Sequence, residues 1–173
     1  ILFFFLTGGV SSQTREVSFN LVTNANGVLK SKRPQAITQD KYGFLWIADQ
    51  SEKAIFRYDG HYMKMYRNDF KNPNSPGGHN PECLATDSLG NIWIGFYGTG
   101  LDKFDPVTGV FTHYRHDPKD KTSLSSDVVS AVLVDHLGNV WVGSNGGLDL
   151  IDQKTGKFKN YKHLKNDSTS LSY

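Results

Sequence analysis

A motif that recurs at near-constant spacing constrains this chain more than any other feature of the sequence. Three segments, DKYGFLWIAD, DSLGNIWIGF and DHLGNVWVGS, share the pattern D-x-x-G-x-aliphatic-W-aliphatic and begin at Asp40, Asp87 and Asp135. The tryptophans are 47 and then 48 residues apart, at Trp46, Trp93 and Trp141. A period of this length indicates stacked copies of one supersecondary unit, each of which needs its neighbours to bury its apolar faces.

Each unit reads as four short strands, which are clearest in the third unit. Residues 128–134 (VVSAVLV) are nearly all apolar, as expected of a strand covered on both faces. A turn with Asp135 and Gly138 leads to a second strand over 140–144. Residues 148–152 (LDLID) alternate between apolar and polar, which predicts a half-exposed third strand, and residues 157–161 complete the set.

A four-stranded repeat of this length predicts an all-β fold, a β-propeller of about three antiparallel blades in an incomplete ring. The blades are expected at about 19–67, 68–115 and 116–163, and a fourth begins at 164–173, where STSLSY repeats the KTSLSSD of residues 121–127. Propellers close with about four to eight blades. We therefore expect a fragment of a longer protein that, expressed alone, is insoluble or oligomerises.

The N-terminus differs in kind from the repeats. Residues 1–6 (ILFFFL) are solidly apolar, and small or polar residues follow. Residues 1–12 are thus predicted to be the remnant of a signal peptide, with 13–173 forming the propeller. The alternative is a buried N-terminal strand. The apolar run is much shorter than the ~20 residues of a membrane-spanning helix.

Composition narrows the classes of partner. The 173 residues carry 19 Lys and Arg against 17 Asp and Glu, a formal charge of +2. No basic stripe is present, so nothing suggests nucleic acid or an anionic membrane surface as a partner of this segment. The single cysteine, Cys83, excludes an internal disulfide and cysteine-based metal sites, and it is expected to be a buried small hydrophobe.

Two of the units resemble the two-component regulator propeller repeat. The pattern D-x-x-G-N-[IV]-W-[IV]-G occupies 87–95 and 135–143, and G-L-D-x-[FI]-D-x-x-T-G-x-F-x-x-Y occupies 100–114 and 147–161. Residues 123–135 (SLSSDVVSAVLVD) fit the same family. The first unit departs from it, because Phe44 replaces Asn, Ala48 replaces Gly and the x-T-G turn is missing.

This resemblance implies a function. Such repeats form the periplasmic sensor region of membrane-bound bacterial regulators, among them hybrid two-component systems that contain a histidine kinase and signal by phosphorelay. The implied protein is exported, anchored in the inner membrane by a downstream segment, and detects oligosaccharides. Its other partners would be the remaining blades and, in one arrangement, a second copy in a homodimer.

The residue types give little sign of chemistry. The repeated tryptophans could stack on sugars, but one Trp at the same place in every blade is more typical of packing between blades. The repeated aspartates lie at a constant distance from a glycine, which favours a turn role over metal or acid–base chemistry. His113 and His116 point to opposite faces of a strand and have no third ligand nearby. We predict no catalytic residue, metal or cofactor, and hence no enzyme activity, in this segment.

A binding surface is expected where the loops vary between units, since function concentrates in loops on a rigid scaffold. The loops after the Trp strands, 49–52, 96–98 and 144–146, differ in sequence and lie on the same face as the long inter-blade loops that include Arg33 and Asn80. The ligand-facing candidates are Arg33, Asp49, Tyr97 and Asn145.

Two further hypotheses stay open at this level. The chain could be part of a secreted propeller lyase or hydrolase that acts on glycans, which would need catalytic residues from other blades. It could also be a scaffold that binds other proteins.

Overall fold

The structure is a computed structural model that describes residues 23–24, 27–28 and 33–171. A two-stranded pair, β1 (Thr23–Asn24) and β2 (Gly27–Val28), precedes three four-stranded antiparallel sheets. The first 22 residues lie outside the described part, and so does the predicted signal peptide.

Each sheet is a meander in which every strand pairs with the next in the sequence. Blade 1 contains β3 (Pro34–Gln39), β4 (Leu45–Asp49), β5 (Ala54–Tyr58) and β6 (Met63–Arg67). Blade 2 contains β7 (Pro81–Thr86), β8 (Ile92–Phe96), β9 (Gly100–Asp105) and β10 (Val110–Tyr114). Blade 3 contains β11 (Val129–Val134), β12 (Val140–Ser144), β13 (Gly147–Asp152) and β14 (Lys157–Tyr161).

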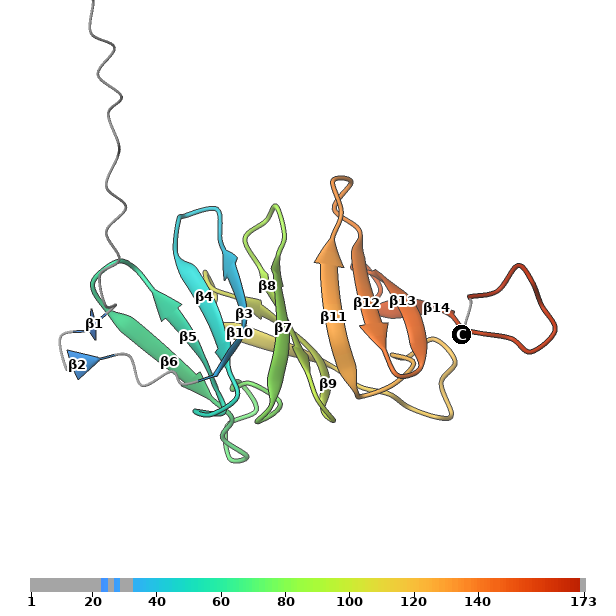
Figure 1. Cartoon of the computed structure of the whole chain (residues 1–173), viewed down its shortest axis with the longest axis horizontal. Coiled ribbons are helices and arrows are strands. Elements are labelled where there is room, and N and C mark those ends of the chain that lie inside the picture. The colour runs from blue at the N-terminus through green and yellow to red at the C-terminus, as the bar shows by residue number, and fades with distance from the viewer. Residues whose placement is uncertain (1–22, 25–26, 29–32, 172–173) are drawn as a thin grey trace, which may run out of the picture.

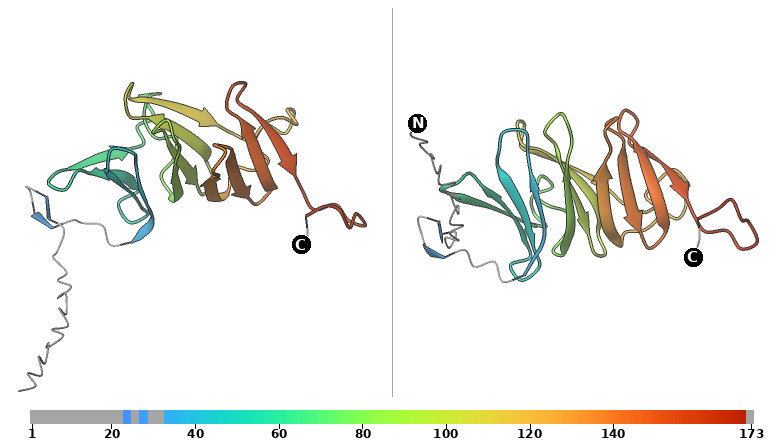
Figure 2. Two further views of the ribbon diagram at one scale, coloured as in Figure 1. Left: turned by 90° about the horizontal axis from the view of Figure 1, so that it is seen from above. Right: turned by 45° about the horizontal axis from the view of Figure 1, so that its top comes forward.

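The three blades stand side by side (Figure 1), and the first strand of blade 2, β7, contacts both β3 and β11. The two other views show the same succession of blades (Figure 2). The sheets do not close on one another, so the all-β, open propeller predicted from the repeat is confirmed. All strands of each sheet fall within the ranges predicted for the blades, whose outer limits remain predictions.

The repeated aspartate builds the turn between the first two strands of every blade and also holds the tryptophan. In blade 2 the Oδ1 atom of Asp87 accepts bonds from the backbone N–H groups of Leu89 and Asn91, at 3.0 and 2.9 Å, while Gly90 takes a positive φ of 93°. The Oδ2 atom accepts the indole N–H of Trp93 at 3.0 Å. The predicted turn role is thus confirmed, and the carboxylate has a second role that the spacing did not reveal.

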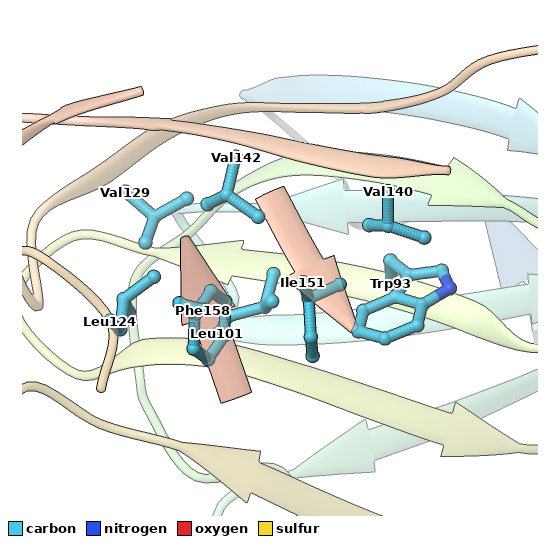
Figure 3. Packing of buried hydrophobic residues seen from close by; sticks show 8 residues of the cluster. All are labelled: Trp93, Leu101, Leu124, Val129, Val140, Val142, Ile151 and Phe158. Atoms are coloured by element: carbon cyan, nitrogen blue, oxygen red, sulfur yellow. The ribbon is translucent and has the colours of Figure 1, made fainter. Parts of the chain in front are cut away.

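Tryptophan packing joins the blades. Trp46 of blade 1 lies against Phe104 of blade 2, with ring centroids 5.6 Å apart. Trp93 of blade 2 belongs to the core with blade 3, in which Leu124 from the connecting loop is also fully buried. Figure 3 shows this cluster, formed by Trp93, Leu101, Leu124, Val129, Val140, Val142, Ile151 and Phe158. The structure confirms the packing interpretation for Trp46 and Trp93, and the half-buried Trp141 lies on the outer face of blade 3.

Two expectations for single strands were wrong. On β11, Leu133 is 61% exposed because it lies on the face of blade 3 that points away from blade 2. On β13, the polar residue of the alternating pattern, Asp149, is fully buried. Its carboxylate accepts hydrogen bonds from Ser125 and Asn160, and this satisfies a charge that the alternation alone placed in solvent.

Candidate ligand-binding site

A hollow of about 470 Å³ opens between blades 1 and 2, at the end of the sheets where the loops after the Trp strands lie. It is lined by Arg33, Gln50, Ser51, Asn80, Glu82 and Tyr97. This volume falls within the range of about 300–1,000 Å³ that small-molecule sites occupy.

Equivalent backbone bonds place these residues in successive blades. The residue after each Trp strand donates its N–H to the carbonyl of the residue that precedes the blade's first strand. Gln50 donates to Arg33 at 3.2 Å, Tyr97 to Asn80 at 2.9 Å, and Asn145 to Val128 at 3.0 Å. The hollow combines the first two of these pairs, since they belong to adjacent blades.

The side chains around the hollow offer several kinds of contact. Tyr97 is 60% exposed and presents a flat ring with a hydroxyl group. The Gln50 amide donates to the Glu82 carboxylate, which fixes both groups at one wall. The exposed Arg33 supplies a guanidinium with several donors. One aromatic surface, two opposite charges and neutral polar groups suit a small, hydroxyl-rich molecule.

The four candidates from the sequence are placed differently. Arg33 and Tyr97 both line the hollow. Asp49 is buried below it, where its Oδ1 accepts bonds from Ser51 Oγ at 2.6 Å and Glu52 N at 2.7 Å. Asp49 therefore shapes the turn that carries Gln50 and Ser51. Asn145 is exposed at the equivalent position of blade 3, away from this hollow.

Glu82 lines the hollow but was not among the residues predicted from the sequence. It lies on β7, one residue into a strand whose sequence, PECLAT, is otherwise short of charge. A charged residue inside an apolar strand next to the variable loops is the signal that could have identified it. Its alignment with Gln50 on the neighbouring blade could not be predicted, because it depends on how the blades pack.

Further observations concern metal sites, the free thiol and membrane-spanning helices in the described part of the chain. Over 23–24, 27–28 and 33–171, no group of three or more His, Cys, Asp or Glu side chains could hold a metal ion. Cys83 is largely buried, and burial raises the pKa of its thiol to about 12, which makes it a poor nucleophile. Among the residues that the structure describes, no helix is long and apolar enough to cross a membrane.

The fold places this chain in the class of β-propeller proteins. Residues 123–146 match the family model described as two component regulator propeller. The match confirms the resemblance read from the motifs within residues 123–146. No curated protein matches the sequence.

Solved structures extend the comparison. The extracellular domain of a putative hybrid two-component system from B. thetaiotaomicron is 29% identical, with a TM-score of 0.70 over 78% of this chain. The chain spans only 19% of that domain's length. A virginiamycin B lyase from Staphylococcus aureus is 19% identical, with a TM-score of 0.59 over 82% of this chain and 44% of its own.

PorZ, a surface component of the type-IX secretion system of Porphyromonas gingivalis, is 18% identical, with a TM-score of 0.59 over 79% of this chain and 20% of its own. At these identities the lyase and PorZ support the propeller fold alone.

Proposed function

We propose that this chain is the ligand-sensing propeller portion of a membrane-bound two-component signalling protein. The observation that carries the proposal is the regulator propeller repeat at 123–146, together with the 29% identity to the extracellular domain of a putative hybrid two-component system. The same similarity supports an exported, periplasmic location. The histidine kinase and the membrane anchor would lie in other parts of the protein.

We further propose that the ligand is an oligosaccharide and that it binds in the hollow between blades 1 and 2. Tyr97 would stack on one face of a sugar ring, because its own ring is exposed and flat. Gln50, Asn80 and Glu82 would bond the hydroxyl groups, and Arg33 would close the rim. Because the hollow lies between two blades, a ligand that prefers one arrangement of the blades would shift the equilibrium toward it.

The test is a binding measurement with defined oligosaccharides on the longer protein of which we propose this chain is a part. Calorimetry against a panel of neutral and acidic oligosaccharides should identify one class that binds. Tyr97→Ala should weaken that binding about tenfold, which corresponds to about 1.4 kcal/mol.

The matched control is Tyr62→Ala. Tyr62 is also a strongly exposed tyrosine, but it lies beside the β5–β6 turn and does not line the hollow. If the wild type and Tyr97→Ala bind the oligosaccharide with equal affinity, the hollow between blades 1 and 2 is not the binding site. Turnover of the oligosaccharide would contradict the sensor proposal and favour a glycan lyase or hydrolase. Binding of a protein partner, with no oligosaccharide bound, would favour a scaffold.

A further inference from the structure

A buried carboxylate fastens the first inter-blade loop (residues 68–80) to blade 2. Asp102, on β9, is fully buried, and its Oδ2 accepts the backbone N–H of Gly77 at 2.6 Å. Its Oδ1 is bonded to His113 Nδ1 at 2.8 Å and to Arg115 Nη1 at 3.0 Å. Gly77 packs so closely that an added Cβ would lie 1.8 Å from Arg115 Nη2. A larger residue at position 77 would therefore have to displace the Arg115 guanidinium from the Asp102 carboxylate.

The hydrogen bonds of His113 define its protonation state. Nδ1 faces the Asp102 carboxylate at 2.8 Å, and Nε2 faces the carbonyl oxygen of Pro73, in the same loop, at 3.0 Å. Carboxylates and carbonyls only accept hydrogen bonds. A neutral imidazole has a single N–H, so it can make one of these bonds and must turn a lone pair toward the other acceptor. Both bonds exist together only in the imidazolium.

In blade 3 a side chain that does not titrate bonds both the buried carboxylate and the inter-blade loop. Asn160 stands opposite Asp149 on β14, as His113 stands opposite Asp102 on β10. Its amide nitrogen donates to Asp149 Oδ1 at 2.7 Å and to the Ser123 carbonyl at 3.1 Å, which ties the second inter-blade loop (residues 115–128) to blade 3. An amide NH₂ carries two donors at every pH.

We propose that His113 is a proton-dependent clamp that holds the first inter-blade loop on blade 2 while its ring is charged and loosens that loop when it loses the proton. The second loop, held by Asn160, keeps its attachment over the same range of pH. Among the described residues, the equivalent positions opposite Asp102 and Asp149 thus hold a group that titrates, His113, and a group that does not, Asn160.

The charged groups around His113 favour the protonated, positively charged form of its ring. The pKa of His113 is raised from its ordinary value of 6.5, chiefly by the bond to Asp102, and burial and the Arg115 charge act in the opposite direction. The loop itself contributes the uncharged carbonyl of Pro73. A raised pKa means that the clamp is complete below pH 6.5 and is lost as the pH rises through the pKa of the folded protein.

The clamp acts on the candidate site because the first inter-blade loop ends at Asn80, which lines the hollow. The backbone of Asn80 stays bonded to the Tyr97 N–H when the Pro73 end of the loop loosens, so the Asn80 side chain would be less firmly placed and binding would weaken at alkaline pH. This last consequence rests on the proposed function, whereas the clamp itself does not.

Tryptic cleavage after the exposed Lys71 reports on the first loop, and cleavage after Lys119 and Lys121 reports on the second. The rates are measured by mass spectrometry without ligand, at pH 6 and pH 8.5, for the wild type and His113→Asn. The variant replaces imidazole by the amide that blade 3 uses. We expect equal cleavage at Lys71 for both proteins at pH 6, and at least threefold faster cleavage in the wild type at pH 8.5.

A second variant tests the same idea in the other blade. Asn160→His should add a similar acceleration at pH 8.5 at Lys119 and Lys121, while cleavage at Lys71 stays as it is in the wild type. The same ratio of cleavage rates at both pH values for wild type and His113→Asn would overturn the proposal. Since no ligand is present, this failure is distinct from a failure of the sensing function, which binding measurements decide.

Discussion

The same face of the repeated sheet is covered in blade 2 and uncovered in blade 3. A comparison of these two blades therefore shows what a neighbouring blade contributes to burial. Trp93 and Leu101, on the face of blade 2 that meets blade 3, are fully buried. Their counterparts Trp141 and Leu148, on the outer face of blade 3, are only partly buried. The sequences of these segments are nearly the same, so burial is set by the neighbouring blade and not by the residues themselves.

The connecting loops repeat the contrast. Ser123 Oγ bonds the backbone N–H of Asp117 at 2.9 Å, and Ser170 Oγ makes the equivalent bond to Leu164 at 2.9 Å. The loops thus close in the same way. The leucine that follows is 0% exposed in the first case (Leu124) and 37% exposed in the second (Leu171). The last loop extends beyond blade 3 (Figures 1 and 2). Local hydrogen bonds are therefore enough to form such a loop, whereas its leucine becomes buried only when a following blade packs against it.

The largest effect is expected at the covered tryptophan. Trp93→Ala should lower the free energy of unfolding by about 3–5 kcal/mol, because it leaves a cavity between two blades and frees the Asp87 carboxylate of its indole partner. Trp141→Ala should cost less than half as much. Urea unfolding of the isolated chain, followed by circular dichroism, measures both losses. Equal losses would contradict the contrast between the covered and the outer face.

The loop leucines should give the next largest difference. Leu124→Ala is expected to cost about 2–4 kcal/mol, as a buried leucine does, whereas Leu171→Ala should cost less than about 1 kcal/mol. The same urea experiment applies. A loss at Leu171 that matches the loss at Leu124 would mean that the outer loop is covered in solution, for example by a second copy.

Acid should weaken the turn of blade 3 in a defined range. Bonds from Asn139 and Trp141 lower the pKa of Asp135 from 3.8 to about 2. A lowered pKa means that the contribution of this carboxylate to stability is complete above pH 3.8 and is lost as the pH falls through about 2. The stability difference between wild type and Asp135→Asn should therefore shrink from pH 4 to pH 2, and a constant difference would contradict the assigned bonds.

The smallest change in stability is expected on the outer face of blade 3. Leu133→Glu should alter the free energy of unfolding by less than about 0.5 kcal/mol, because Leu133 is 61% exposed. It should nevertheless reduce association of the isolated chain in sedimentation velocity, since it places a charge on the uncovered face. Leu137→Glu, at an exposed turn, is the control and should leave association unchanged.

Much of the fold and part of the candidate site could be predicted from the residues. Asp87, Gly90 and Trp93 lie within seven residues of one another and specify a turn and an indole anchor locally. The candidates Arg33 and Tyr97 followed from loop variation alone. The bond between Gln50 and Glu82 was beyond prediction, because these residues are 32 positions apart and come from different blades. The buried Asp102 and Asp149 were hidden for the same reason, since their partners include Gly77 and Ser125 from the inter-blade loops.

By itself the sequence determined the unit: four strands, a turn built on aspartate and glycine, and a tryptophan at a fixed place, all of which depend on contacts between residues close in the chain. Only the tertiary structure decided which copies of the unit are buried, which loops share a hollow and which histidine has an acceptor at both ring nitrogens. Those properties depend on groups that the stacking of blades brings together. The sequence of one repeat does not specify how the next repeat packs against it.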